Sequence, residues 1–156
     1  MDFLFKISLL LHSWNRWAIL IFGIAVIVLA VKGLTSGSRY NNSSRKGMFF
    51  FILSLHLQLL VGLLLYFVLS PVTSVALSDL GAAMKDGTLR FWAVEHAFVN
   101  IIAIAVAQTG SIIVKKRTND RDKHRLALIW TLIAMILIIS MIPMGIMGVD
   151  RPWFRF

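Results

Sequence analysis

Four long stretches without a charged residue limit the fold of this chain more than any other feature. A helix needs about 20 mostly apolar residues to cross the hydrocarbon core of a bilayer, which is roughly 30 Å thick. Each stretch, taken with its flanks, is long enough, and we expect transmembrane helices at about 13–31, 48–69, 91–114 and 126–147. The uncharged stretches that predict them are Ala18 to Val31, Met48 to Thr73, Ala97 to Val114 and Leu126 to Val149.

The segments between these helices are too short to hold a soluble domain with its own core. Residues 1–156 are therefore predicted to form a single four-helix transmembrane domain, an all-α membrane protein with up-down-up-down topology. Membrane β-strands are excluded because the stretches lack the alternation of apolar and polar residues that a barrel requires. The longest connection, which follows Pro71, predicts a short interfacial helix at about Thr73 to Met84.

Lysine and arginine residues indicate the orientation. The connection between the first two helices and the connection between the last two hold ten of the 16 lysines and arginines, and the other side holds six. By the positive-inside rule, these connections are cytoplasmic and both termini are periplasmic. The same bias accounts for the formal net charge of +9. No nucleic-acid partner is predicted, since no element here can read a groove.

The chain contains no cysteine, which excludes disulfides, thiolate metal sites and covalent haem attachment through a CxxCH pair. Any metal must be held by nitrogen, oxygen or methionine sulfur. Hydrolytic catalysis is not indicated, because no nucleophile, base and orienting acid share one face. Whether the chain is an enzyme stays open, and a redox-active chain is expected to be an electron-transfer subunit rather than a stand-alone enzyme.

Polar side chains within apolar helices carry most of the functional information, because they are costly in hydrocarbon and usually face a protein interior or a cavity. At 100° per residue, the first and third helices each have one narrow face of polar and small residues. We expect both faces to point into the bundle or onto a bound cofactor. On the first helix these residues are His12, Arg16, Gly23 and Ala30, and on the third they are Trp92, His96, Asn100, Ala103, Ala107 and Ser111.

The second helix has polar residues on two faces. His56 lies on one of them, while Ser54, Gln58 and Gly62 lie about half a turn away. Either this helix is contacted on two sides within the bundle, or one face meets another chain. Other membrane subunits or a second copy of the chain are therefore expected partners, besides the lipid bilayer.

One of the four histidines lies in each predicted helix or within two residues of its start. Histidine is the usual axial ligand of non-covalent haem, and two diagonal helices can hold a haem between them. Alternation across the membrane groups His12 with His96 towards the outside and His56 with His124 towards the cytoplasm, so the pattern predicts haem b on one or both pairs. Each pair is offset in depth by roughly 8 to 15 Å at 1.5 Å per residue, so a single haem between His56 and His96 is an alternative.

These histidines differ in strength as candidate ligands. His96 is the leading metal ligand, and His12 and His56 are its candidate partners. His124 stands between two basic residues near a helix end and is expected to be a solvated interfacial residue.

Charged residues near the outer boundary suggest two roles. Arg16 and Glu95 lie at similar predicted depths, so an ion pair between them is expected. In a cofactor-binding interpretation, Arg16 or Arg90 meets a haem propionate, while Glu95 orients an imidazole or relays a proton.

Several segments resemble one known family. They are HSWNRW (His12 to Trp17), HLQLLVGLLLYF (His56 to Phe67), AAMKDGTLRFWAVEH (Ala82 to His96) and KHR (Lys123 to Arg125). They are similar to a family of small four-helix membrane proteins that is common in Bacteroidetes-type bacteria and often labelled "cytochrome B". The resemblance covers nearly the whole chain and implies a multi-pass protein of the bacterial inner membrane, with a haem.

Three functions remain from the sequence. The first is a b-type cytochrome that passes electrons within a respiratory or redox assembly, with a quinone as a further cofactor. The second is a non-catalytic accessory subunit or assembly factor of a larger membrane complex. The third is a metal or small-solute transporter, since histidine and methionine suit copper. Its ligands would come from His12, His56 and His96 together with Met135, Met141, Met144 and Met147.

Overall fold

The structure is a computed structural model that describes residues 2–144, 149, 152 and 154. In this part of the chain all regular elements are helices, and there is no β-strand. Four helices are long and apolar enough to cross a membrane, as the uncharged stretches predict. Their main segments are α1 (Asp2–Ser36), α2 (Asn42–Leu64), α6 (His96–Lys116) and α7 (Asp120–Ser140).

Two π-helical turns and three short helices lie between α2 and α6. The π-helical turns continue α2 at its end and precede α6 at its start, and the short helices occupy the connection in which an interfacial helix is predicted at about 73–84. The π-helical turns are η1 (Leu65–Leu69) and η2 (Phe91–Glu95), and the short helices are α3 (Pro71–Ser78), α4 (Leu80–Ala83) and α5 (Gly87–Arg90).

Several helix boundaries differ from those that hydropathy predicts. The first helix begins at Asp2 rather than at residue 13, and the second begins at Asn42 rather than at residue 48. The last helix runs from Asp120 to Ser140 rather than over 126–147. Residues 145–147 of that predicted range lie outside the described part of the chain. An uncharged stretch marks only the part of a helix that hydrocarbon can surround, whereas helices continue beyond it through charged residues. The last helix ends three residues before Pro143, a poor helix residue because it has no backbone N–H and its ring clashes with the preceding turn.

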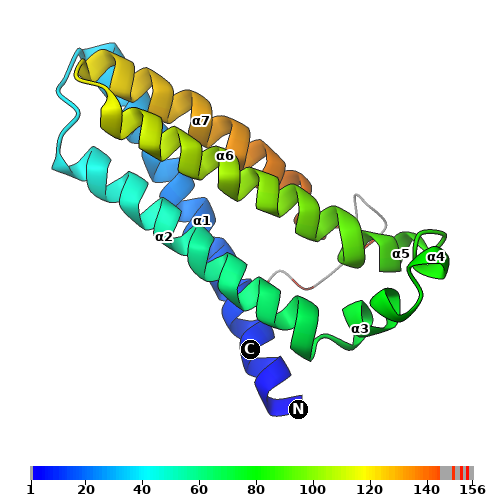
Figure 1. Ribbon diagram of the computed structural model, residues 1–156. Coiled ribbons are helices and arrows are strands. Elements are labelled where there is room, and N and C mark those ends of the chain that lie inside the picture. Colours follow the sequence, from blue (N-terminus) through cyan, green and yellow to red (C-terminus); the bar gives the residue numbers. More distant parts are fainter. Residues whose placement is uncertain (1, 145–148, 150–151, 153, 155–156) are drawn as a thin grey trace.

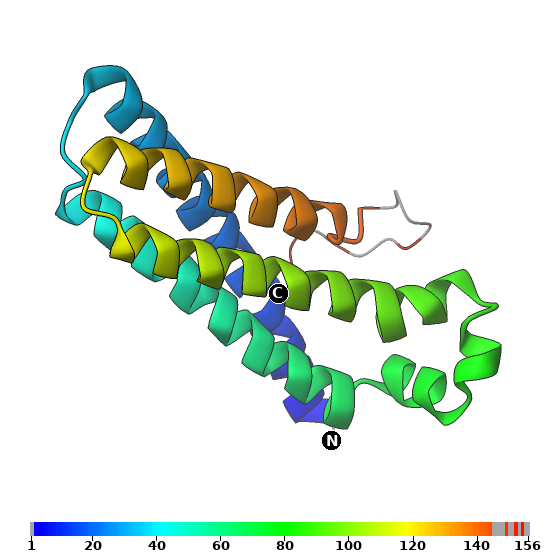
Figure 2. The same cartoon turned by 45° about the horizontal axis from the view of Figure 1, so that its top comes forward.

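The four long helices lie side by side in an elongated bundle (Figures 1 and 2). α1 packs along both α2 and α7, and α6 packs along α7, whereas the contact between α2 and α6 is shorter. No such extended contact joins α1 and α6 within the described residues, so these two helices lie on a diagonal of the bundle. The two short connections gather at one end, and towards the other end α2 and α6 diverge and are joined through α3, α4 and α5 (Figure 1).

Local signals explain where the helices begin and end. Gly37 follows α1 with a φ of 64°, a left-handed conformation that glycine adopts without steric cost. Asn41 caps α2 by accepting a hydrogen bond from the backbone N–H of Ser44, and Asn119 caps α7 in the same way through Arg121 and Asp122. These caps hold the turns at the basic end of the bundle.

The predicted inward faces of the first and third helices are confirmed. Ala30, Ala103, Ala107 and Ser111 are all buried, and their exposed fractions do not exceed 3%. Small side chains at these positions let the helix backbones approach closely. Gly23 belongs to the same face, because a Cβ atom there would overlap the side chain of Met135 on α7.

A polar network joins α1 to α2 within the bundle. The Asn15 side-chain amide donates hydrogen bonds to the Ser54 carbonyl oxygen and to Gln58 Oε1, both at 2.8 Å. Gln58 Nε2 in turn donates to the His12 carbonyl oxygen at 3.1 Å. The Ser54 and Gln58 face of α2 therefore packs against α1 within the bundle.

Replacing Asn15 with alanine is expected to destabilise the fold by about 1 kcal/mol, a typical value for one interhelical polar contact in a membrane protein. The change removes both donors and leaves Gln58 Oε1 without its hydrogen bond. Denaturant titration in detergent micelles measures the effect. Asn42→Ala at an exposed position of α2 is the matched control, and an equal loss in both variants would contradict this role of Asn15.

Candidate cofactor site

The fold brings His12 of α1 and His96 at the start of α6 close together. Their ring centroids lie 6.3 Å apart, so the two rings differ in depth by little more than one helical turn at most. The expected offset of roughly 8 to 15 Å at 1.5 Å per residue is therefore too large for this pair.

The two imidazole rings lie close together across the diagonal of the bundle. Their centroids are 6.3 Å apart and their planes are tilted by 52°. A metal bound about 2.0 Å from a nitrogen of each ring would separate the centroids by roughly 6 Å, because a nitrogen lies about 1.1 Å from its ring centre. The tilt between the planes does not exclude such a pair, because each imidazole would be free to rotate about its own bond to the metal.

Hydrogen bonding orients the His96 ring. Its Nδ1 lies 3.0 Å from the carbonyl oxygen of Met141, which follows α7. Because a carbonyl can only accept, Nδ1 donates, and in the neutral ring the lone pair is then on Nε2. Metal-binding histidines commonly show this arrangement, in which one nitrogen donates to a backbone carbonyl and the other is left to bind the metal.

The His12 ring has an unsatisfied nitrogen. Its Nδ1 is buried and has no hydrogen-bond partner among the described residues. A Cβ atom on Gly62 would lie 3.3 Å from His12 Cε1, so this glycine leaves room for the ring beside α2. A buried polar atom without a partner is costly, and it points to a ligand or water that completes the site.

Both histidines line a cavity of about 530 Å³ between α1, α2 and α6. This volume falls within the usual range for small-molecule and cofactor sites, about 300–1,000 Å³. Its walls are mostly apolar and include Ile19, Leu59 and Ile104. The polar and charged groups that reach it include His12, Arg16, Gln58, Tyr66, His96 and Asn100.

The two π-helical turns form one end of this cavity. Tyr66 of η1 donates a hydrogen bond from its hydroxyl to the Ala93 carbonyl oxygen of η2, at 2.6 Å, and both residues line the cavity. The Trp92 ring of η2 packs against His96 with centroids 5.3 Å apart. π-Helical turns are rare and are frequent at functional sites, where they change the direction of side chains.

The charged residues near the site are arranged differently from the predicted pair of Arg16 and Glu95. Glu95 accepts a hydrogen bond from Arg90 Nε at 2.7 Å, and both side chains are partly exposed. Arg16 lines the cavity, whereas Arg90 and Glu95 do not. Of the two arginines considered as partners for a propionate, the structure therefore brings only Arg16 to the cavity.

His56 does not join the site. It is exposed on the outer face of α2, away from the Ser54 and Gln58 face that packs on α1. The structure brings His56 together with neither His96 nor His124. Of the histidine pairs considered from the sequence, only His12 with His96 is therefore formed.

His124 is buried, so the expectation that it is solvated is wrong. Its exposed fraction is 1%, and neither ring nitrogen has a hydrogen-bond partner among the described residues. The ring packs against the Gly33 backbone and lies 5.0 Å from the Tyr40 ring in an edge-on contact. The basic residues on either side of His124 suggest a surface position. The ring is buried instead because Gly33, far away in the sequence, leaves room for it.

The described residues do not form a metal site made by protein ligands alone. No group of three or more His, Cys, Asp or Glu residues converges there. Met135 packs against Gly23 in the core, and Met141 takes part through its backbone carbonyl; Met147 lies outside the described residues. Two imidazoles suit a metal whose other ligands come from a macrocycle.

Comparison with known proteins finds no match: no family model, no curated protein and no solved structure resembles the chain closely enough to identify a relative.

Proposed function

We propose that this chain is a b-type cytochrome-like membrane protein in which His12 and His96 hold one haem. The observation that carries this proposal is the convergence of two imidazoles from diagonal helices, 6.3 Å apart, on a cavity with apolar walls. A haem held in this way supplies reversible one-electron transfer.

The chain's own residues have distinct tasks in this proposal. Met141 orients His96 through its carbonyl oxygen, and the apolar walls exclude water from the site. Arg16 at the cavity provides a positive charge for an anionic edge group of the cofactor. The protein would pass electrons within a redox assembly, to or from a partner subunit or a quinone.

The proposed location is the bacterial inner membrane, with up-down-up-down topology. The lysine and arginine bias favours an orientation with the connections after α1 and α6 in the cytoplasm and both termini in the periplasm. The cavity with His12 and His96 then lies towards the periplasmic side.

A visible spectrum of the protein, purified from haem-replete cells, tests the proposed function. We expect a reduced-minus-oxidised difference spectrum with a b-type α-band and about one haem per chain, as one bis-histidine site predicts. Haem extraction and pyridine haemochrome quantification give the stoichiometry. Folded protein without this band would overturn the proposal.

The accessory-subunit function is the second candidate, and the position of His56 favours it. A polar side chain on the outer face of a transmembrane helix usually meets a partner. If the chain lacks haem, the same bundle would serve as a packing subunit, with His56 at the interface. Co-purification of another membrane protein that is lost in His56→Leu would support this candidate.

A further inference from the structure

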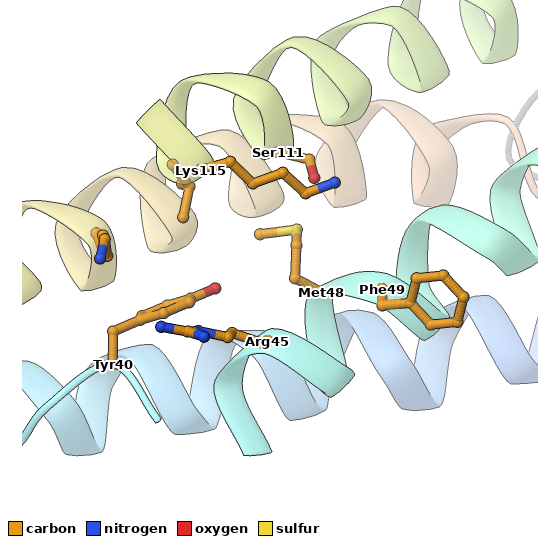
Figure 3. Close-up of a pocket in the computed structure, with 8 residues that line it drawn as sticks. Tyr40, Arg45, Met48, Phe49, Ser111 and Lys115 are labelled. Carbon is orange, nitrogen blue, oxygen red and sulfur yellow. The ribbon is translucent and has the colours of Figure 1, made fainter. Parts of the chain in front are cut away.

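A second pocket lies at the other end of the bundle, beside the connections that follow α1 and α6. Its volume is about 490 Å³, and it shares no lining residue with the cavity that holds His12 and His96. Figure 3 shows Lys115 running along the α6 wall towards Ser111, with Arg45 and Tyr40 on the opposite wall. This pocket plays no part in the proposed electron transfer.

Positive charge dominates the pocket. Arg45 of α2, Lys115 of α6 and Lys123 of α7 line it, and no carboxylate of the described residues does. Asp120 lies 3.9 Å from Lys123 Nζ and partly offsets that charge. Arg45 and Lys115 therefore leave an excess of positive charge facing a shared space, which favours an anionic ligand.

Two hydroxyl groups add neutral hydrogen-bond donors. The side chains of Tyr40 and Ser111 both line the pocket and are nearly buried. Burial raises the pKa of Tyr40 to about 12, against the opposing effect of Arg45, so the phenol stays protonated at neutral pH. Its hydroxyl donates a long hydrogen bond of 3.4 Å to the Ser44 carbonyl oxygen, and a charged oxygen could replace this acceptor.

The rest of the wall is apolar and comes from Met48, Phe49 and Val114. A pocket at the ends of membrane helices lies near the level of lipid headgroups, and basic pockets between such helices are known to bind acidic headgroups. The combination of cations, hydroxyl donors and an apolar wall matches a phosphate group attached to a less polar molecule.

We propose that this pocket binds a phosphate group through Arg45, Lys115 and Lys123, with Tyr40 and Ser111 as hydroxyl donors. An anionic phospholipid and dissolved phosphate are the two sources of this group. The apolar wall favours the lipid.

Native mass spectrometry of the full chain tests the proposal. Protein in detergent micelles is titrated with phosphatidylglycerol, with phosphatidylcholine or with inorganic phosphate, at about 0.15 M salt, where loosely held charges are largely screened. We expect one phosphatidylglycerol to stay bound per chain, and phosphatidylcholine to bind at least tenfold more weakly. Retention of inorganic phosphate, and its competition with the lipid, would assign the site to the free anion, which also supports the proposal.

The variant Arg45→Gln/Lys115→Gln is expected to bind at least tenfold more weakly, because it removes two of the three cations that line the pocket. Arg39→Gln/Lys116→Gln is the matched control, because it removes the same charge from exposed residues outside the pocket and should change binding less than about threefold. If the double variant does not fold, the single variant Lys115→Gln, at an exposed position, is used to measure the loss of lipid binding instead. Equal weakening in both double variants, or in neither, would overturn the proposal.

Discussion

His12→Ala and His96→Ala are each expected to remove the b-type absorption band, with bound haem falling at least tenfold. Loss of a coordinating ligand should exceed the 10- to 100-fold loss of metal affinity that is typical for removing an outer-shell partner. The two variants should behave alike, because each removes one of the two imidazoles proposed to hold the haem. Haem content per folded chain, measured from the pyridine haemochrome, gives the result.

His56→Ala is the matched control for this pair. It removes the same side chain from an exposed position on α2 that is not part of the cavity, and we expect an unchanged spectrum and haem content. Size-exclusion chromatography and circular dichroism establish that all three variants fold. Loss of haem in His56→Ala, or its full retention in His12→Ala and His96→Ala, would reject the proposed ligand pair.

Gly33→Ala is expected to lower the free energy of unfolding by about 3 kcal/mol, the upper range for overpacking a tight core. A Cβ atom at this position would overlap the His124 ring, which is buried between α1 and the loop that carries Tyr40. Neither the rigid ring nor the helix backbone can move away easily. Denaturant titration in detergent micelles measures the loss.

A double-mutant cycle shows whether the His124 ring causes this effect. In a His124→Ala background the cost of Gly33→Ala should fall below about 1 kcal/mol, because the overlapping ring is gone. Gly47→Ala on α2 is the matched control, since its Cβ would meet only ordinary contacts with Leu29 and Val26, at 3.5 and 3.7 Å. An equal cost of Gly33→Ala in both backgrounds would contradict the predicted overlap.

Much of the fold follows from the order of the residues alone. Hydropathy predicts the four long helices, because a transmembrane helix must satisfy its backbone within itself and is therefore visible as a local run of apolar residues. Helical periodicity predicts the inward faces that contain Ala30 and Ala103, since 100° per residue is a local property of the helix.

Tertiary structure decides which polar groups meet. Hydropathy cannot show where α1 begins, because the helix continues through Lys6 to Asp2, beyond the apolar stretch. Nor can it show that the rings of His12 and His96 lie 6.3 Å apart, since they belong to different helices. Hydropathy also cannot show which of the two polar faces of α2 packs inside the bundle. The Gln58 face does so because Asn15 of α1 donates a hydrogen bond to Gln58. The physical reason is that a pairing distance depends on how whole helices pack, whereas hydropathy and periodicity report only on each helix separately.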